Sequence, residues 1–277
     1  MNPMRLAVYV ALAMLAFAAN SLLCRLALKD TSIDAASFST VRILSGALTL
    51  SFVMQWQTRS SRMQGSWHGA LALFIYIVAF SFAYLSLSAG TGALLLFGAV
   101  QTTMVVAGFI AGERMSRLQS AGFAAALVGL IVLVLPGVEA PTLAGSTLML
   151  TSGIAWGMYS LFGRGVSDPT AATTGNFLRA VPLAIALSLL TFPWLKLNAM
   201  GLLYAVLSGA LASGLGYVLW YRVLQHMSSM TASTVQLSAP VIVALGGIVL
   251  LDEALTANML IATLLILGGI GLVLRKR

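Results

Sequence analysis

The chain consists largely of apolar runs of about 20 residues, separated by short stretches that carry charge, proline or polar turn residues. A run of about 20 apolar residues is the length that an α-helix needs to cross the hydrocarbon core of a bilayer. We count ten such runs, at residues 6–24, 36–55, 69–88, 92–111, 120–135, 143–162, 174–192, 200–223, 231–251 and 257–274. The sequence therefore predicts an all-α integral membrane protein with ten transmembrane helices.

The composition supports a membrane protein and argues against several other classes. Hydrophobic residues make up 60% of the 277 residues and charged residues only 8%, whereas a soluble domain has about 25% charged residues. The net charge of +8 is spread thinly at the ends of the apolar runs, without the basic patch that nucleic-acid binding needs. Cys24 is the only cysteine, so no disulfide and no cysteine-based metal cluster is expected within the chain. No cofactor-binding motif appears between the runs, and we expect no cofactor.

The basic residues predict the orientation of the chain. With the N-terminus in the cytoplasm, eleven of the 15 Lys and Arg residues fall on the inner side. The outer side then holds four, which are Arg25, Lys29, Arg42 and Lys196. Because Lys and Arg are enriched in cytoplasmic connections, we expect a multi-pass protein of a bacterial-type plasma (inner) membrane, with both termini cytoplasmic.

Two stretches of the sequence share one layout, which indicates an internal repeat. In 17–25 and in 156–164 an aromatic residue is followed by a small residue, Ser and Leu recur at the same offset, and an Arg stands eight residues after the aromatic. Arg42 and Arg179, at the starts of the second and seventh runs, form a second pair, and Glu113 and Glu253 form a third. The three pairs are separated by 137 to 140 residues. We therefore expect two related five-helix units, residues 1–137 and 138–277.

An odd number of spans in each unit makes the second unit cross the membrane in the opposite sense to the first. Such inverted repeats allow two similar packings, each open to one side of the membrane, with the binding site near the midplane between the units. The sequence therefore predicts transport by alternating access.

At these positions the chain resembles the drug/metabolite transporter superfamily, in particular its ten-helix members built from two EamA-type repeats. Trp156-Gly157 with Arg164 and Pro240 thirteen residues before Glu253 match that pattern, and the match covers nearly the whole chain. In the first unit Phe17-Ala18 replaces the Trp-Gly pair and Val100 replaces the proline, so the two units need not bend alike. The resemblance implies a secondary transporter, and amino-acid exporters of the family imply an amino-acid-like substrate.

Polar and aromatic side chains inside the spans are the candidates for substrate binding. Asn and Gln cannot satisfy their hydrogen bonds within one helix, so in a membrane they should face a cavity or a neighbouring helix. Aromatic residues three or four positions apart share a helix face and could form a cavity wall. The predicted substrate-binding residues are Asn20, Tyr76, Phe80, Phe97, Gln101, Trp156, Tyr159, Tyr217 and Gln236. By contrast, the hydroxyls of Ser and Thr in the spans should mostly bond the carbonyl one turn back.

Other residues in the spans have structural or mechanical interpretations. Pro240 removes a backbone hydrogen bond from the ninth span and Gly246 loosens the next turn, so these two are predicted to form a hinge; a static kink is the alternative. The glycine-rich fifth and tenth spans should pack closely outside the pathway. Arg42 and Arg179 should reach the interface or bond helix-end carbonyls, with gating as an alternative. The aromatic residues near span ends should be interfacial anchors, namely Tyr84, Trp194, Trp220 and Tyr221.

No Asp or Glu lies within a span, which disfavours an organic cation as substrate, and we expect no Lys or Arg deep in the spans to hold a phosphate. Without intramembrane His, Asp or Glu, an intramembrane enzyme is excluded. A pure scaffold or receptor would not need amides at mid-membrane. We expect a transporter that exports amino acids or similar small zwitterionic or neutral metabolites and works as a monomer among membrane lipids. An importer or exchanger of another small metabolite, and a broad-specificity drug exporter, remain alternatives.

Overall fold

The computed structural model describes residues 2–56, 63–87, 89–134, 142–251 and 257–275, and these ranges contain helices and connections only. Ten spanning units follow one another in them, of which the eighth and ninth are each built from more than one helical segment. The first five are α1 (Pro3–Asp30), α2 (Ala35–Trp56), α3 (Trp67–Ala83), α4 (Ala89–Ile110) and α5 (Arg117–Val134). The other five are α6 (Leu143–Gly163), α7 (Pro169–Leu190), α8–η3–α9, α10–α11 and α12 (Ala257–Leu274).

The eighth and ninth units differ from simple α-helices. The eighth begins as α8 (Ala199–Leu207), continues as a π-helix, η3 (Ser208–Leu215), and ends as α9 (Gly216–Leu224). A short 3-10 helix, η2 (Phe192–Trp194), precedes it. The ninth is divided into α10 (Ser229–Gln236) and α11 (Ser238–Leu251).

Within the described ranges, four helices are both long and apolar enough to cross a membrane, judged by length and composition: α1, α2, α7 and the continuous helix 199–224. Shorter apolar helices cover α3 and parts of α4, α5 and α12. Large apolar side chains are exposed around the outside of the bundle, as shown by Leu48, Ile110 and Leu264 at 72%, 83% and 75% exposure. An apolar exterior of this kind suits lipid rather than water.

Polar residues at the helix ends explain where several helices begin. Asp168 caps α7 by accepting from the backbone N–H groups of Thr170 and Ala171, and Pro169 occupies the first turn, where a missing N–H does no harm. Thr142 caps α6 and Ser228 caps α10 in the same manner. These caps satisfy donors at the helix ends that hydrocarbon could not satisfy.

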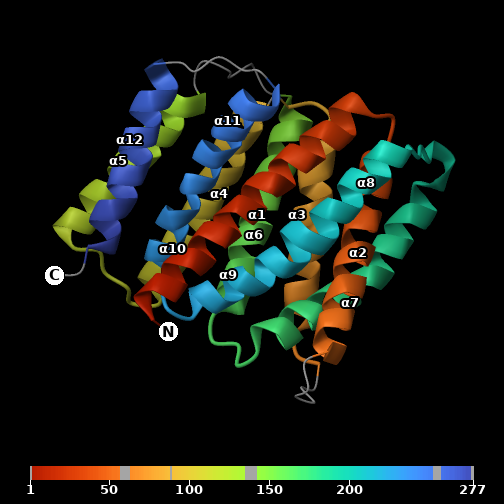
Figure 1. The fold of residues 1–277 in the computed structure, drawn as a ribbon, viewed down its shortest axis with the longest axis horizontal. Helices are drawn as coiled ribbons and strands as arrows, with labels where there is room; N and C mark the ends of the chain where they lie inside the picture. Colours follow the sequence, from red (N-terminus) through yellow and green to blue (C-terminus); the bar gives the residue numbers. More distant parts are fainter. Residues whose placement is uncertain (1, 57–62, 88, 135–141, 252–256, 276–277) are drawn as a thin grey trace.

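The helices contact one another in a nearly two-fold pattern (Figure 1). α3 and α4 both pack on α6. In the corresponding contacts, α8 with α9 takes the place of α3, α11 takes the place of α4, and α8, α9 and α11 all pack on α1. α5 and α12 lie side by side at one edge of the bundle, and α2 and α7 lie together near the opposite edge. This is the pairing expected of two five-helix units facing each other. The predicted boundary between residues 137 and 138 lies outside the described residues, and the division there stays a prediction.

Both chain termini lie at the same end of the bundle, here called the termini end (Figure 1). The start of α1 and the end of α12 line one surface groove there, with Pro3, Leu6 and Leu274 among its residues. An even number of spans requires this arrangement.

The contact of α5 with α12 depends on glycine. A Cβ atom added at Gly122 would lie 2.6 Å from the carbonyl oxygen of Gly269, and one added at Gly129 would lie 2.8 Å from Cγ1 of Ile266. Only residues without a side chain permit so close an approach of the two backbones. The glycines thus lie at a helix contact, and the place of these two helices outside the pathway stays a prediction.

Candidate functional site

The most unusual side chain in the interior is that of Arg42, on α2. It is 0% exposed, and its guanidinium donates to hydroxyl oxygens of two neighbouring spans. Nε donates to Ser213 Oγ over 2.9 Å, and Nη2 donates to Tyr217 Oη over 2.8 Å and to Tyr76 Oη over 3.4 Å. The guanidinium carbon also lies 5.4 Å from the ring centre of Tyr76 and 5.9 Å from that of Phe80. Arg42 therefore connects α2 with α3, η3 and α9.

The π-helix η3 supplies the polar groups next to Arg42. Ser208 and Ser213 both donate to the side-chain oxygen of Asn20 on α1, over 2.6 and 3.2 Å, and the Asn20 amide donates to Tyr217 Oη over 3.3 Å. Gly209 lies against the carbonyl oxygen of Arg42, where a Cβ would collide with the α2 backbone. Because π-helical segments are frequent at functional sites, this one marks the region as a candidate site.

Five aromatic residues form the centre of the bundle, and we call them the central aromatic cluster: Phe17, Tyr76, Trp156, Tyr159 and Tyr217. The ring centre of Trp156 lies 4.8 Å from those of Tyr76 and Tyr217, 5.0 Å from that of Phe17 and 5.7 Å from that of Tyr159. The cluster joins α1 and α3 to α6 and α9. In this conformation, ring contacts occupy the position where the sequence predicts a chamber.

Two amides extend the site from the cluster towards α4 and α10. Trp156 Nε1 donates to Gln236 Oε1 over 2.6 Å, and Gln236 Nε2 lies 3.2 Å from the sulfur of Met104. Gln101 Nε2 donates to the carbonyl oxygen of Ser233 over 2.7 Å. Gln101 is 3% exposed and Gln236 is 0% exposed, so both amides lie inside the protein.

Three buried side-chain atoms in the described residues lack a hydrogen-bond partner: Arg42 Nη1, Gln101 Oε1 and Tyr159 Oη. Tyr159 belongs to the central aromatic cluster and Arg42 contacts it at Tyr76, whereas Gln101 lies on α4 and bonds α10, the helix that carries Gln236. A buried polar atom without a partner is unfavourable by about 1–3 kcal/mol, more when it is charged. Their presence in one region indicates a place where a ligand could provide the missing partners.

The structure brings most of the predicted substrate-binding residues together. Asn20, Tyr76, Trp156, Tyr159 and Tyr217 contact one another directly or through a shared neighbour. Phe80 lies beside Tyr76, with ring centres 5.8 Å apart, and Gln236 is bonded to Trp156. Gln101 lies on the neighbouring helix and bonds α10. Phe97 is half-buried against the core, and no described ring contact joins it to the cluster.

The predicted hinge residues, Pro240 and Gly246, both lie in α11, after a break in the ninth span. α10 ends at Gln236 and α11 begins at Ser238, so the break is at Leu237. Pro240 stands in the first turn of α11; since proline has no backbone N–H, it cannot bond the Gln236 carbonyl in the helical pattern. Gly246 lies inside α11. Movement at these residues stays a prediction.

Several predictions about polar and aromatic residues were wrong. Arg42 neither reaches the interface nor bonds helix-end carbonyls, and the expectation of no Lys or Arg deep in the spans fails at this residue. Tyr84, Trp220 and Tyr221 are buried rather than interfacial, because neighbouring helices cover them; Trp220 donates to Ser160 Oγ over 3.0 Å.

Trp194 is 70% exposed, and its role as an interfacial anchor stays a prediction. Arg179 donates to the carbonyl oxygen of Gln64, which precedes α3, and to that of Gly175.

Sequence reasoning also missed parts of the site. Phe17 was noted only as a repeat marker, although its ring packs on Trp156 and Trp220. The run of small residues in η3 contains no pattern that predicts a π-helix. The burial of Arg42 could have been predicted, because this arginine stands seven residues after the start of a helix that carries no acidic residue.

A charged contact holds helices together at the termini end. Arg164 forms an ion pair of 2.9 Å with Glu113 and also donates to Ser229 Oγ, and Glu113 accepts from the backbone N–H groups of Ser229 and Met230. Partial burial by itself would raise the pKa of Glu113, but the two N–H donors and the charge of Arg164 outweigh it and lower that pKa. Glu113 therefore links the α4–α5 connection to α6 and α10.

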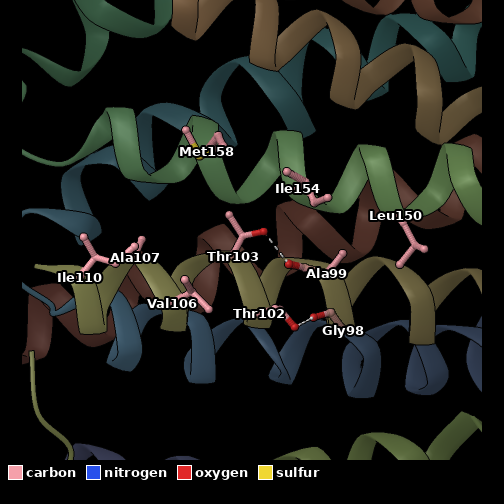
Figure 2. Close-up of a pocket in the computed structure, with 10 residues that line it drawn as sticks. All are labelled: Gly98, Ala99, Thr102, Thr103, Val106, Ala107, Ile110, Leu150, Ile154 and Met158. Atoms are coloured by element: carbon pink, nitrogen blue, oxygen red, sulfur yellow. Dashed lines mark hydrogen bonds between the residues drawn. The ribbon is translucent and has the colours of Figure 1, made fainter.

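An open groove of about 570 Å³ is lined by residues of α4 and α6, and none of these lining residues belongs to the central aromatic cluster (Figure 2). Its walls are mostly apolar, with Val106, Ile110 and Ile154 exposed. Thr102 and Thr103 lie in it, but their hydroxyls donate to the carbonyl oxygens one turn back, as expected from the sequence. The groove therefore suits lipid chains and offers little to a polar solute.

Comparison with known proteins agrees with this architecture. The model of the EamA-like transporter family matches residues 143–275. An uncharacterized protein of Pseudomonas aeruginosa is 54% identical over 267 residues, covering 96% of this chain and 93% of the relative. A probable amino-acid metabolite efflux pump of Salmonella typhimurium is 26% identical over 202 residues, covering 66% of each chain. A solved crystal structure shares the fold, with a TM-score of 0.79 at 18% identity and coverage of 98% of this chain and 97% of that one.

The fold and these relatives define a multi-pass membrane transporter of small molecules, and not an enzyme. The chain belongs to the EamA-like transporter family, within the drug/metabolite transporter superfamily.

Proposed function

We propose that the protein is a secondary transporter that exports amino acids or similar small zwitterionic or neutral metabolites across the plasma membrane by alternating access. The observation that carries the proposal is the buried site formed by the central aromatic cluster with Arg42, Gln101 and Gln236. In this proposal the protein works as a monomer with both termini in the cytoplasm.

The chemistry of the site supports a small solute with both polar and apolar parts. Ring faces of Trp156 and Tyr76 can pack on an apolar side chain, while Gln101 Oε1 can accept a hydrogen bond and Arg42 Nη1 can donate one. A few polar groups in a mostly aromatic surrounding is the usual composition of a small-molecule site.

The position of the site supports alternating access. α1, α2, α3 and α4 contribute residues from the first predicted unit, and α6, α9 and α10 contribute residues from the second. When a site lies between two units, rocking of one unit against the other can open it to either side in turn.

The alternatives differ in direction and in substrate. The name of the Salmonella relative, a probable amino-acid metabolite efflux pump, favours export over import or exchange of another metabolite. A broad-specificity drug exporter is less well supported, because cationic drugs would meet the buried charge of Arg42 and no described carboxylate nearby.

Counterflow in liposomes tests the proposal. Purified protein is reconstituted, and accumulation of labelled amino acids is compared for wild type, Trp156→Ala and Gln101→Ala. We expect at least about tenfold lower rates for both variants, since each loses a contact to the solute. Trp194→Ala and Gln55→Ala, at exposed positions, are the matched controls and should behave as wild type. If folded wild-type protein accumulates none of the labelled amino acids, amino acids are excluded as substrates.

A further inference from the structure

Arg42 carries a full positive charge into the interior, and no anionic side chain of the described residues bonds it. It stands seven residues after the start of α2, which places it roughly 10 Å along the helix. Its described hydrogen-bond partners are three hydroxyl groups, on Ser213, Tyr76 and Tyr217. No carboxylate of the described ranges bonds or pairs with it, and Nη1 is buried and unpartnered.

A cation in this position is strongly unfavourable unless an anion accompanies it, because burial removes its hydration. Hydroxyl dipoles and the ring faces of Tyr76 and Phe80 offset part of this loss, but they supply no net negative charge. A carboxylate at Nη1 would supply both the charge and the missing acceptor. Guanidinium and carboxylate groups match in geometry and form short, strong hydrogen bonds.

A purely structural role leaves two of these features without a reason. Helix connection through three hydroxyls needs a donor but not a charge, and apolar replacements of buried ions often leave a protein equally stable. A purely structural role also does not explain why Nη1 is buried without a partner. The repeat-related Arg179 shows what a structural arginine looks like here: its Nη1 bonds the carbonyl oxygens of Gln64 and Gly175 at the termini end.

We propose that Arg42 binds the carboxylate of the transported solute through Nη1 and thereby restricts transport to carboxylic acids. The proposal rests on the transport function proposed above and specifies its substrate class. Amino acids and 2-hydroxy acids of similar size bind, whereas their amides and the corresponding amines, which lack the carboxylate, do not. The hydroxyls of Ser213 and Tyr217 hold the guanidinium so that Nη1 stays available.

The test compares acids with analogues that lack the carboxylate, on the same protein. Thermal unfolding of purified wild type is measured with the protein amino acids, the matching 2-hydroxy acids, the amino-acid amides and the decarboxylated amines. Counterflow in liposomes is then measured with the compounds that raise Tm. We expect acids to raise Tm and amides and amines to leave it unchanged.

Variants of Arg42 separate binding from folding. Arg42→Lys keeps a cation, so it should keep the preference for acids over amides with about tenfold to hundredfold weaker affinity. Arg42→Gln keeps donors for the hydroxyls but should lose that preference altogether. Arg179→Gln is the matched control and should keep wild-type selectivity. If Arg42→Gln does not fold, the proposal is judged by the ratio of acid affinity to amide affinity, measured in wild type and in Arg42→Lys.

Each outcome has one meaning. Binding of 2-hydroxy acids but of no amino acid supports the carboxylate site and overturns the amino-acid proposal. Binding of amides or amines as strongly as acids overturns the carboxylate site while transport of amino-acid-like solutes stands. Selectivity for acids that survives unchanged in folded Arg42→Gln also overturns the role of Arg42. Absence of binding by every acid and every analogue overturns both proposals.

Discussion

The indole N–H of Trp156 donates to the side-chain oxygen of Gln236 over 2.6 Å and so ties α6 to α10 inside the protein. Trp156→Phe keeps a ring in place but leaves this oxygen buried without a donor. We expect the free energy of unfolding to fall by about 1–3 kcal/mol. Trp156→Phe combined with Gln236→Met removes both partners and should lose less than the sum of the single changes. Denaturant unfolding in detergent measures this, and Trp194→Phe, at an exposed tryptophan, should have no effect.

Pro240 leaves the ninth span interrupted at Leu237, and replacing it tests whether this interruption moves during transport. Pro240→Ala restores a backbone N–H that can bond the Gln236 carbonyl and should join α10 to α11. If the break is a hinge, transport rates fall about tenfold or more while solute affinity is unchanged. The matched control is Pro182→Ala inside α7, which should leave the rate unaltered. Wild-type rates in Pro240→Ala would favour a static kink.

The contact of α5 with α12 should contribute to stability and not to solute recognition. A Cβ at Gly122 would lie 2.6 Å from the carbonyl oxygen of Gly269, so Gly122→Val must push the two helices apart. We expect a loss of about 1–3 kcal/mol in unfolding free energy, with unchanged solute affinity in the folded fraction. Gly271→Ala is the comparison, because no atom of the described residues lies within 4 Å of the added Cβ. Weakened solute binding in Gly122→Val would place α5 in the pathway.

The ion pair of Glu113 with Arg164 predicts how stability changes with pH. The pKa of Glu113 is lower in the folded protein than its ordinary value of 4.5. The pair therefore contributes fully above pH 4.5, and its contribution is lost as pH falls through the lowered value. We expect Tm to differ between wild type and Glu113→Gln by a constant amount from pH 8 to pH 5, and the difference to shrink below about pH 4. A difference that disappeared already between pH 7 and pH 5 would contradict the lowered pKa.

The helices and most of the central residues could be predicted because their signals are local. Apolar runs bounded by polar residues indicate the spans, and the spacing of Tyr76 with Phe80 and of Trp156 with Tyr159 places each pair on one helix face. Asn20 and Gln236 were found because an amide cannot be satisfied within its own helix.

The remaining features depend on packing between distant segments. Arg42 is buried because η3, 171 residues away at Ser213, brings a hydroxyl to its Nε. Trp220 and Tyr221 lie near a span end in the sequence, yet Ser160 and the Tyr159 carbonyl on α6 accept their hydrogen bonds inside the protein. No pattern within a single span shows which neighbour will cover its end.

The eighth span has more residues per turn in η3 than the helices on either side of it. If η3 rewound to ordinary α-helical geometry, the surplus residue would have to move along the helix. The helix that follows η3, which is α9, would then rotate about its own axis by about 100°, the rotation per residue in an α-helix. Tyr217 would turn away from the guanidinium that it now contacts. A change of winding in eight residues could thus uncouple α9 from α2 without unfolding either helix.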